Sequence, residues 1–273
     1  MERAMLSPID LGIILSYQCQ AGCKHCLYAC GARWHQWMTP AQVEEAIEVT
    51  KYWRHPFRIH LTGGEPFLNF ELLLEATKIV AQHGIFQFVE TNAGWCRNER
   101  IAYEKLYELK SLGMDAILIS CSPFQAEHIP LQRTLTAIRV ACDVFGERNV
   151  IVYLPQCIEW VKQFSVERTV PIEAYIERYG MRQVGHMLWE QYGLIGGGRS
   201  SYHLGHLTRK FPAERFRGQN CMLELLYPHH SHFDLYGNHI SWFCGGLSID
   251  YWWRLPETLR EFAKGNFPPL IEI

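Results

Sequence analysis

Three cysteines lie close together near the start of the chain, in the sequence Cys19-Gln-Ala-Gly-Cys23-Lys-His-Cys26. This spacing, directly after an apolar segment, places three thiols on one short loop. Thiolates are soft ligands that select iron–sulfur clusters, zinc or copper(I). A [4Fe–4S] cluster takes four ligands, so three cysteines leave one iron open to an exchangeable ligand. A structural zinc site is the alternative, with Cys30 as its fourth ligand, although four ligands within twelve residues is an unusual zinc spacing.

A pair of glycines follows a later apolar segment, in the sequence Leu61-Thr-Gly63-Gly64-Glu65-Pro66. Positions without a side chain let the backbone approach a ligand closely. The glycine carbonyls and the Glu65 carboxylate are acceptors suited to an ammonium group. A Gly-Gly turn alone is weak evidence of a site, but its place one strand–helix unit after the cysteine loop makes the combination specific.

The elements that position these motifs alternate between strands and helices. Short apolar segments rich in Ile, Val and Phe predict buried parallel strands, at 11–16, 57–62, 85–91, 116–121, 150–154 and 184–189. Helical patterns fall between them, at 39–53, 69–84, 98–112, 125–144 and 165–179. This alternation predicts an α/β fold with one parallel sheet. A full eight-unit barrel needs about 250 residues, so six units favour a partial (β/α)6 TIM-like barrel.

Composition excludes several classes of protein. The 273 residues carry 26 Lys and Arg against 28 Asp and Glu, a formal net charge of −2, so no basic surface for nucleic acid is expected. No segment approaches the roughly 18 apolar residues of a membrane span. No secretion signal is visible, so we expect the ten cysteines to stay reduced in a cytoplasmic protein.

The order of these motifs resembles that of the radical S-adenosylmethionine (SAM) superfamily, over roughly residues 11–200. The resemblance implies an oxygen-sensitive enzyme in which Cys19, Cys23 and Cys26 hold a [4Fe–4S] cluster and SAM chelates the open iron. It also implies that an electron from the cluster cleaves SAM to methionine and a 5′-deoxyadenosyl radical. That radical would abstract hydrogen from a peptide or small-molecule substrate, with flavodoxin or ferredoxin as electron donor.

The resemblance further implies which residues contact SAM, because these follow the ends of the predicted strands. They are His25, Gly63, Gly64, Glu65, Asn92, Ser120, Gln156 and Ile195. His25 stands where the family usually carries an aromatic residue near the adenine. The family often shows Ser-x-Asp where this chain has Ser120-Cys-Ser122, so position 122 departs from the pattern.

The C-terminal part, 201–273, is expected to form a cap on a barrel of residues 1–200 and to carry substrate specificity. Candidate catalytic or substrate residues are Glu90, Cys121, His232, Asp234 and Cys244. Glu90 is a possible general base, with a strand-end ion pair or cap as the alternative. Cys121 and Cys244 are thiols that could return a hydrogen atom to substrate.

Three interpretations of the cap compete. Cys221 and Cys244 resemble the start of an auxiliary-cluster domain, but no cysteine follows Cys244, so a complete domain is excluded and no second cluster is expected. A metal site formed by histidines 229, 230 and 232 is another, in which only His230 and His232 share a strand face. The interpretation that we favour is a β-hairpin around Asp234–Asn238 that closes the mouth or bottom of the barrel.

Two other functions remain open at this level. The first is activation of a glycyl-radical enzyme, a function that other members of the radical SAM superfamily perform. A non-catalytic structural metal-binding module, formed by the four cysteines between 19 and 30, belongs to a different class.

Overall fold

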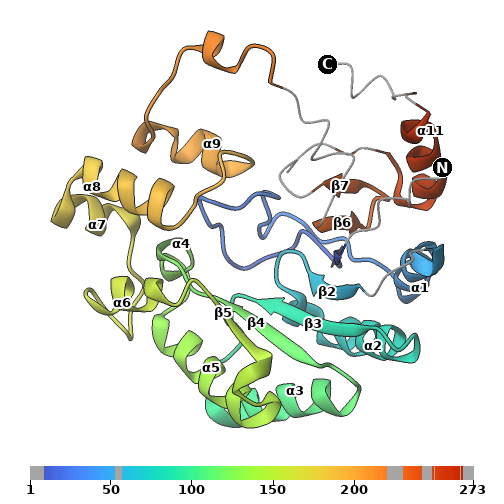
Figure 1. The fold of residues 1–273 in the computed structure, drawn as a ribbon. Coiled ribbons are helices and arrows are strands. Elements are labelled where there is room, and N and C mark those ends of the chain that lie inside the picture. Colours follow the sequence, from blue (N-terminus) through green and yellow to red (C-terminus); the bar gives the residue numbers. More distant parts are fainter. Residues whose placement is uncertain are drawn as a thin grey trace.

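The computed structural model describes residues 9–52, 57–219, 230–241, 248, 250–264 and 266. Its centre is a seven-stranded sheet in the order β5-β4-β3-β2-β1-β6-β7 (Figure 1). The strands are β1 Asp10–Ile14, β2 Arg58–Thr62, β3 Phe86–Thr91, β4 Ala116–Ser120, β5 Val150–Tyr153, β6 His230–Asp234 and β7 His239–Ser241. All neighbouring pairs are parallel except β6 with β7. Within the described part of the chain, β5 and β7 are free edges, which confirms an open, partial TIM-like barrel.

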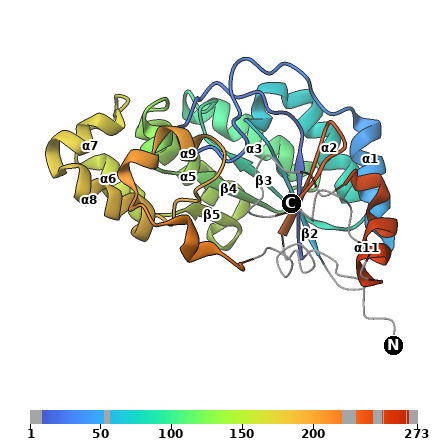
Figure 2. The ribbon, with the colours of Figure 1, turned by 90° about the horizontal axis from the view of Figure 1, so that it is seen from above.

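Helices cover the outer face of this sheet, as the view from above also shows (Figure 2). The long ones are α1 Pro40–Val49, α2 Phe70–Gln82, α3 Glu99–Ser111 and α5 Leu131–Phe145. The shorter ones are α4 Pro123–Ala126, α6 Gln156–Lys162, α7 Ile172–Tyr179, α8 Met181–His186, α9 Arg199–His203 and α11 Leu255–Ala263. No helix in the described ranges has the length and apolar character needed to cross a bilayer.

Side chains alternate between the two faces of each strand, which separates the core from the barrel interior. The core under the long helices includes Leu11, Ile13, Ile59, Leu61, Val89, Ile117 and Ile119. The intervening residues face inward, and several of them are polar: His60, Thr62, Glu90 and Ser120. The strands are thus apolar toward the helices and partly polar toward the interior.

Local sequence signals explain where the long helices begin. Thr39 and Gln42 form a capping box at the start of α1, which satisfies amide groups that the first helical turn leaves unpaired. The side chain of Asn69 caps α2, and that of Asn98 caps α3. These three helix starts confirm the predictions made from the sequence.

The predicted strand at 184–189 is wrong. That segment continues from α8 into a π-helical turn, Met187–Gln191. Val184, Met187 and Leu188 are buried, and their spacing of three and four residues is helical rather than alternating. The predicted helix at 125–144 is split by Pro130 into α4 and α5, and that at 165–179 begins only after Pro171.

The sixth parallel strand is β6, and it lies on the opposite side of the sheet from the predicted one. It pairs with β1, with His232 opposite Gly12. The predicted hairpin is present, since β6 and β7 pair in antiparallel fashion around a turn where Gly237 has φ +93°. It extends the sheet beyond β1, because β6 uses the free hydrogen-bonding edge of that strand.

Candidate functional site

A cavity of about 250 Å³ opens where the carboxyl ends of the parallel strands meet the cysteine loop. This is the end of a barrel where loops after the strands form active sites. Its lining includes Cys19, Cys23, His25, Cys26, Tyr28, Cys30, Gly63, Gly64, Glu90, Asn92, Ser120, Tyr153, Tyr192, Ile195 and Arg199. Residues from the loop, from the ends of β2 to β5 and from the segment before α9 therefore surround one space.

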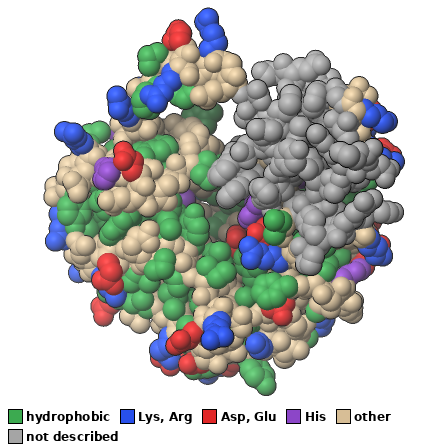
Figure 3. Space-filling view, viewed as in Figure 1, with side chains coloured by type: hydrophobic (Ala, Val, Ile, Leu, Met, Phe, Trp, Pro, Cys, Tyr) green, Lys and Arg blue, Asp and Glu red, His purple; other side chains and the backbone are tan. Residues whose placement is uncertain are grey.

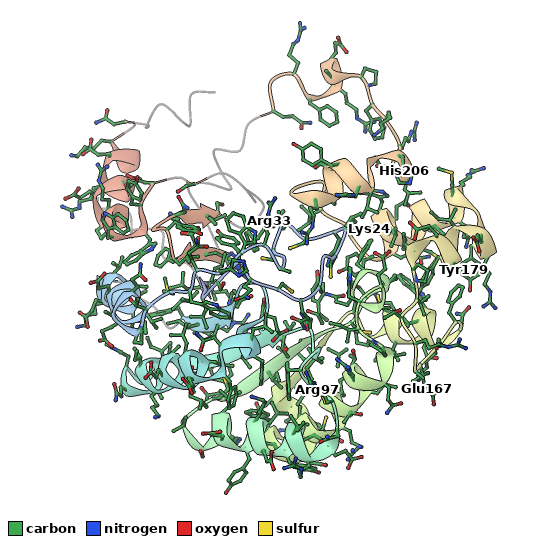
Figure 4. All side chains as sticks on the ribbon, turned by 180° about the vertical axis from the view of Figure 1, so that it is seen from behind. Lys24, Arg33, Arg97, Glu167, Tyr179 and His206 are labelled. Carbon is green, nitrogen blue, oxygen red and sulfur yellow. The ribbon has the colours of Figure 1, made fainter. Side chains whose placement is uncertain are left out.

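The cysteine loop is held at its base and at its side. The Cys19 amide donates to the carbonyl of Gly31 at 3.2 Å, and this contact closes the loop. Lys24, which Figure 4 labels within the loop, pairs through Nζ with Glu127 at 2.7 Å and with Glu173 at 2.9 Å. These carboxylates belong to the segment after α4 and to α7, so the loop is anchored to the helical side of the barrel.

The glycine pair after β2 is required by the cysteine loop itself. The Gly64 amide donates to the carbonyl of Ser16 at 2.8 Å, and the Glu65 amide donates to that of Gln18 at 2.9 Å. A Cβ atom on Gly64 would lie 1.9 Å from the Gln18 oxygen. A Cβ on Gly63, where φ is +133°, would lie 2.3 Å from the Ser16 oxygen. The absence of these side chains lets the two backbones meet.

Several amide groups point at the thiol sulfurs. The Ala21 amide and the Asn92 side-chain amide each donate to the sulfur of Cys19 at 3.4 Å. The Cys30 amide donates to the sulfur of Cys26 at 3.3 Å. Such donors favour the thiolate, which is the form that binds metal.

Burial and charge act in opposite directions on these thiols. Burial raises the pKa of Cys19 to about 12 and also raises that of Cys23. A hydrogen bond from the Cys30 thiol lowers the pKa of Cys26 to about 6. Arg199 adds a positive charge beside all of them, and its Nε donates to the carbonyl of Cys23 at 2.9 Å. Because thiolates buried without a cation are unfavourable, the loop is suited to a metal centre that compensates their charge.

The spacing of the thiols bears on whether the loop is already arranged for a single ion. A zinc ion holds sulfur at about 2.3 Å, which places its sulfurs about 4 Å apart. Among the described residues, the groups of three ligand atoms within 4.8 Å of one another are His60–His230–His232 and Glu44–Glu48–His83. The sulfurs of the loop cysteines do not form a group of three within that distance.

The comparison with protein families is decisive here. A sequence model of the radical SAM superfamily matches residues 13–153, which is more than half of the chain. The chain belongs to the radical SAM superfamily. It is therefore an enzyme whose family performs SAM-dependent radical chemistry and whose family cofactors are a [4Fe–4S] cluster and SAM. No curated protein sequence matches the chain.

Solved structures with a similar fold are distant in sequence. One is BtrN in complex with AdoMet and 2-DOIA, with 12% identity and a TM-score of 0.49, covering 97% of this chain and 89% of that one. Another is Streptococcus suis SuiB bound to precursor peptide SuiA, with 12% identity and a TM-score of 0.46. That match covers 98% of this chain and 66% of SuiB.

Most residues predicted to contact SAM line the cavity of this radical SAM enzyme: His25, Gly63, Gly64, Asn92, Ser120 and Ile195. Gln156 does not line it, and is exposed as the first residue of α6. Glu65 does not line it either. Its fully buried carboxylate accepts hydrogen bonds from the Thr91 hydroxyl at 2.8 Å and the Asn92 amide at 2.8 Å. Burial raises the pKa of Glu65 to about 7, although these hydrogen bonds act to lower it.

Two neighbouring positions have clear local roles. The His25 ring stacks on Phe124 with ring centroids 4.5 Å apart, and it meets Tyr192 edge-on. Burial lowers the pKa of His25 to about 3, so the ring is neutral and serves as an aromatic surface. Ser122, where the family pattern has Asp, caps α4 by accepting a hydrogen bond from the Gln125 amide.

The candidate substrate residues are dispersed. Glu90 lines the cavity, and its Oε2 accepts a hydrogen bond from Thr62 at 2.7 Å. Cys121 is buried beside the cavity without lining it. Asp234 accepts hydrogen bonds from the Tyr17 hydroxyl at 2.6 Å and from the hairpin, and it lines a separate cavity of about 380 Å³. Cys221 and Cys244, like His229, lie outside the described residues.

The lining residues that were not predicted from the sequence include Tyr28, Tyr153, Tyr192 and Arg199. Tyrosines are frequent in this chain, so their type alone carries no signal. Arg199 directly follows the Gly196-Gly-Gly198 run, which was the available clue. Its amide donates to the carbonyl of Cys26 at 3.0 Å, a contact that only the tertiary structure reveals.

Proposed function

We propose that this enzyme binds a [4Fe–4S] cluster through Cys19, Cys23 and Cys26 and binds SAM in the adjoining cavity. The observation that carries the proposal is the convergence of three thiols and the ends of β2 to β5 on one cavity. When bound, these cofactors would supply the reductive cleavage of SAM and, through it, the abstraction of hydrogen from a substrate. A one-electron donor such as flavodoxin or ferredoxin would reduce the enzyme.

The chain's own residues orient SAM and exclude water. The backbone at Gly63 and Gly64 offers carbonyl acceptors to the SAM ammonium group. Ser120 and Asn92 present polar side chains from β4 and the end of β3. The stacked ring of His25 and the segment around Ile195 form apolar surfaces suited to the adenine.

The substrate would enter from a second cavity inside the barrel. This cavity has a volume of about 590 Å³ and shares Glu90, Ser120 and Tyr153 with the first. Its far end reaches Asp10 and Arg58 at the start of β1 and β2. Figure 3 shows a hollow on this face, with charged side chains and a histidine at its edge. The volume suits a small molecule or one side chain of a peptide.

The test is reconstitution under anaerobic conditions, followed by two measurements. We expect about four irons per chain with a brown chromophore, and dithionite-dependent formation of 5′-deoxyadenosine from SAM. The Cys19→Ala/Cys23→Ala/Cys26→Ala variant should lose both. A Cys142→Ala variant, changed at a thiol on α5 far from the loop, is the matched control and should keep both. A colourless protein holding one zinc per chain at these cysteines would instead identify a structural metal module.

A further inference from the structure

Three histidines converge inside the barrel: His60 on β2, with His230 and His232 on β6. In the register of the sheet, His60 and His232 both lie opposite Gly12 of β1. A Cβ atom on Gly12 would lie 2.5 Å from Nε2 of His60 and 2.6 Å from Nε2 of His232. Glycine at this position therefore leaves the space in which imidazoles from the two neighbouring strands meet.

The distances between the ring nitrogens are those of ligands around one ion. Nε2 of His232 lies 3.3 Å from Nε2 of His60 and 3.4 Å from Nε2 of His230. The three histidines offer ligand atoms that all lie within 4.8 Å of one another. Zinc binds imidazole nitrogen at about 2.0–2.1 Å, and a tetrahedron of that size places its nitrogens about 3.3–3.4 Å apart.

Hydrogen bonds between the rings do not account for this arrangement. An imidazole nitrogen either donates one proton or accepts one through a single in-plane lone pair. Nε2 of His232 faces two other nitrogens, so it can make a good hydrogen bond to only one of them. Its Nδ1 already pairs with the hydroxyl of Tyr28 at 2.9 Å. Burial keeps these imidazoles neutral by lowering the pKa of His60 and His230 to about 4.

We propose that His60, His230 and His232 bind one divalent transition-metal ion, with zinc as the expected ion, at a site separate from the cysteine loop. Neutral imidazoles suit zinc, and a site with three histidines keeps a fourth position for water or substrate. The Tyr28 hydroxyl pairs with the other ring nitrogen of His232. Metal-binding histidines are commonly oriented by a hydrogen bond of this kind.

The fourth position would face the substrate cavity. Oε1 of Glu90 lies 3.8 Å from Nε2 of His60, close enough to accept a hydrogen bond from a water on the ion. Glu90 and His230 both line the 590 Å³ cavity. An ion held there would act as a Lewis acid toward a carboxylate, carbonyl or hydroxyl oxygen of substrate. The substrate class would then be one that offers such an oxygen.

The first test uses the cluster-loaded protein. After treatment with a chelator and one equivalent of Zn²⁺, gel filtration and elemental analysis should find one zinc per chain in addition to the cluster iron. X-ray absorption at the zinc edge should show nitrogen or oxygen neighbours at about 2.0–2.1 Å with imidazole outer shells. Sulfur neighbours at about 2.3 Å would place the zinc on cysteines and overturn the proposal.

The second test uses variants of the full chain. His60→Gln and His232→Gln should each weaken zinc binding by more than about 100-fold, and Tyr28→Phe by about tenfold. His239→Gln is the matched control, because His239 is also buried in the hairpin but pairs with Ser231 at 3.1 Å.

A last variant separates the two metal sites. Cys19→Ala/Cys23→Ala/Cys26→Ala should keep the zinc while it loses the cluster, so the zinc result does not depend on radical chemistry. Unchanged zinc affinity in a His60→Gln/His232→Gln double variant would overturn the proposal. Loss of the zinc from the triple cysteine variant, in which the histidines are intact, would also overturn the proposal.

Discussion

The side-chain amide of Asn92 donates a hydrogen bond to the sulfur of Cys19 at 3.4 Å, joining the residue after β3 to the first cysteine of the loop. The amide oxygen of Asn92 is fixed in turn by Gln20 and by the Gly94 amide, each at 2.8 Å. The donor is thus held toward the sulfur. Hydrogen bonds to ligand sulfurs tune the potential of an iron–sulfur cluster, because they stabilise the more negatively charged reduced state.

Asn92→Ala should therefore make the reduced cluster less stable. One hydrogen bond contributes about 1 kcal/mol, which corresponds to about 40 mV for one electron. We expect the midpoint potential, measured by redox titration followed by electron paramagnetic resonance, to fall by about that amount. Gln125→Ala is the control, since Gln125 lines the same cavity with no hydrogen bond to a cysteine sulfur. An unchanged potential in Asn92→Ala would show that this amide does not act on the cluster.

Gly64→Ala should disrupt the cysteine loop. The added methyl group would lie 1.9 Å from the Gln18 oxygen and 3.0 Å from Cβ of Cys19, so the loop must move. We expect iron per chain after reconstitution to fall several-fold. Gly22→Ala lies within the same loop, where the nearest atom to a new Cβ is 3.7 Å away, and it should retain normal iron content. Equal iron content in both variants would contradict the packing argument.

Arg199→Gln should weaken retention of the cluster. Its guanidinium is the positive charge beside the buried thiols, and its Nε also holds the carbonyl of Cys23 at 2.9 Å. The loss of cluster absorbance in the presence of an iron chelator should become several-fold faster. Arg33→Gln is the matched control, because Arg33 is exposed just after Gly31, where the loop closes, and lies over the ring of Trp34 with 5.1 Å to its centroid (Figure 4). Equal rates in the two variants would exclude this role for Arg199.

Trp252→Ala should destabilise the barrel as a whole. Trp252 is 2% exposed, stacks on Phe233 of β6, and donates through Nε1 to the carbonyl of Asp234 at 3.1 Å. Removing such a side chain costs about 3–5 kcal/mol. Urea unfolding should show that loss in a single transition, as expected if β6 and β1 unfold together. Trp253→Ala, at a position 51% exposed, should cost much less. A separate transition for the C-terminal part would instead support an independent cap.

The first five strands and the three capped helices could be predicted because their signals are local. The strand at 57–62 carries Phe57, Ile59 and Leu61 at alternating positions, and Thr39, Asn69 and Asn98 cap through hydrogen bonds to residues three positions later. The parallel pairing of the hairpin strand with β1 could not be predicted in this way. A short apolar run such as 184–189 satisfies either a strand or a helix. The strand that joins β1 is the segment 230–234, whose two histidines share the face toward the barrel interior.

The cysteine spacing and the Gly63-Gly64 pair were by themselves sufficient to predict the superfamily, because metal ligation and backbone approach depend on residue type over a few positions. The tertiary structure decided how these motifs are used. It brings the side chains of Asn92 and Arg199 into contact with the cysteine loop. It leaves Glu65 and Gln156 outside the lining of the cavity. It also brings the rings of His60 and His232 together beside Gly12. Those relationships depend on strand order and register, which join residues as distant in the sequence as His60 and His232, 172 positions apart, and leave no trace in local spacing.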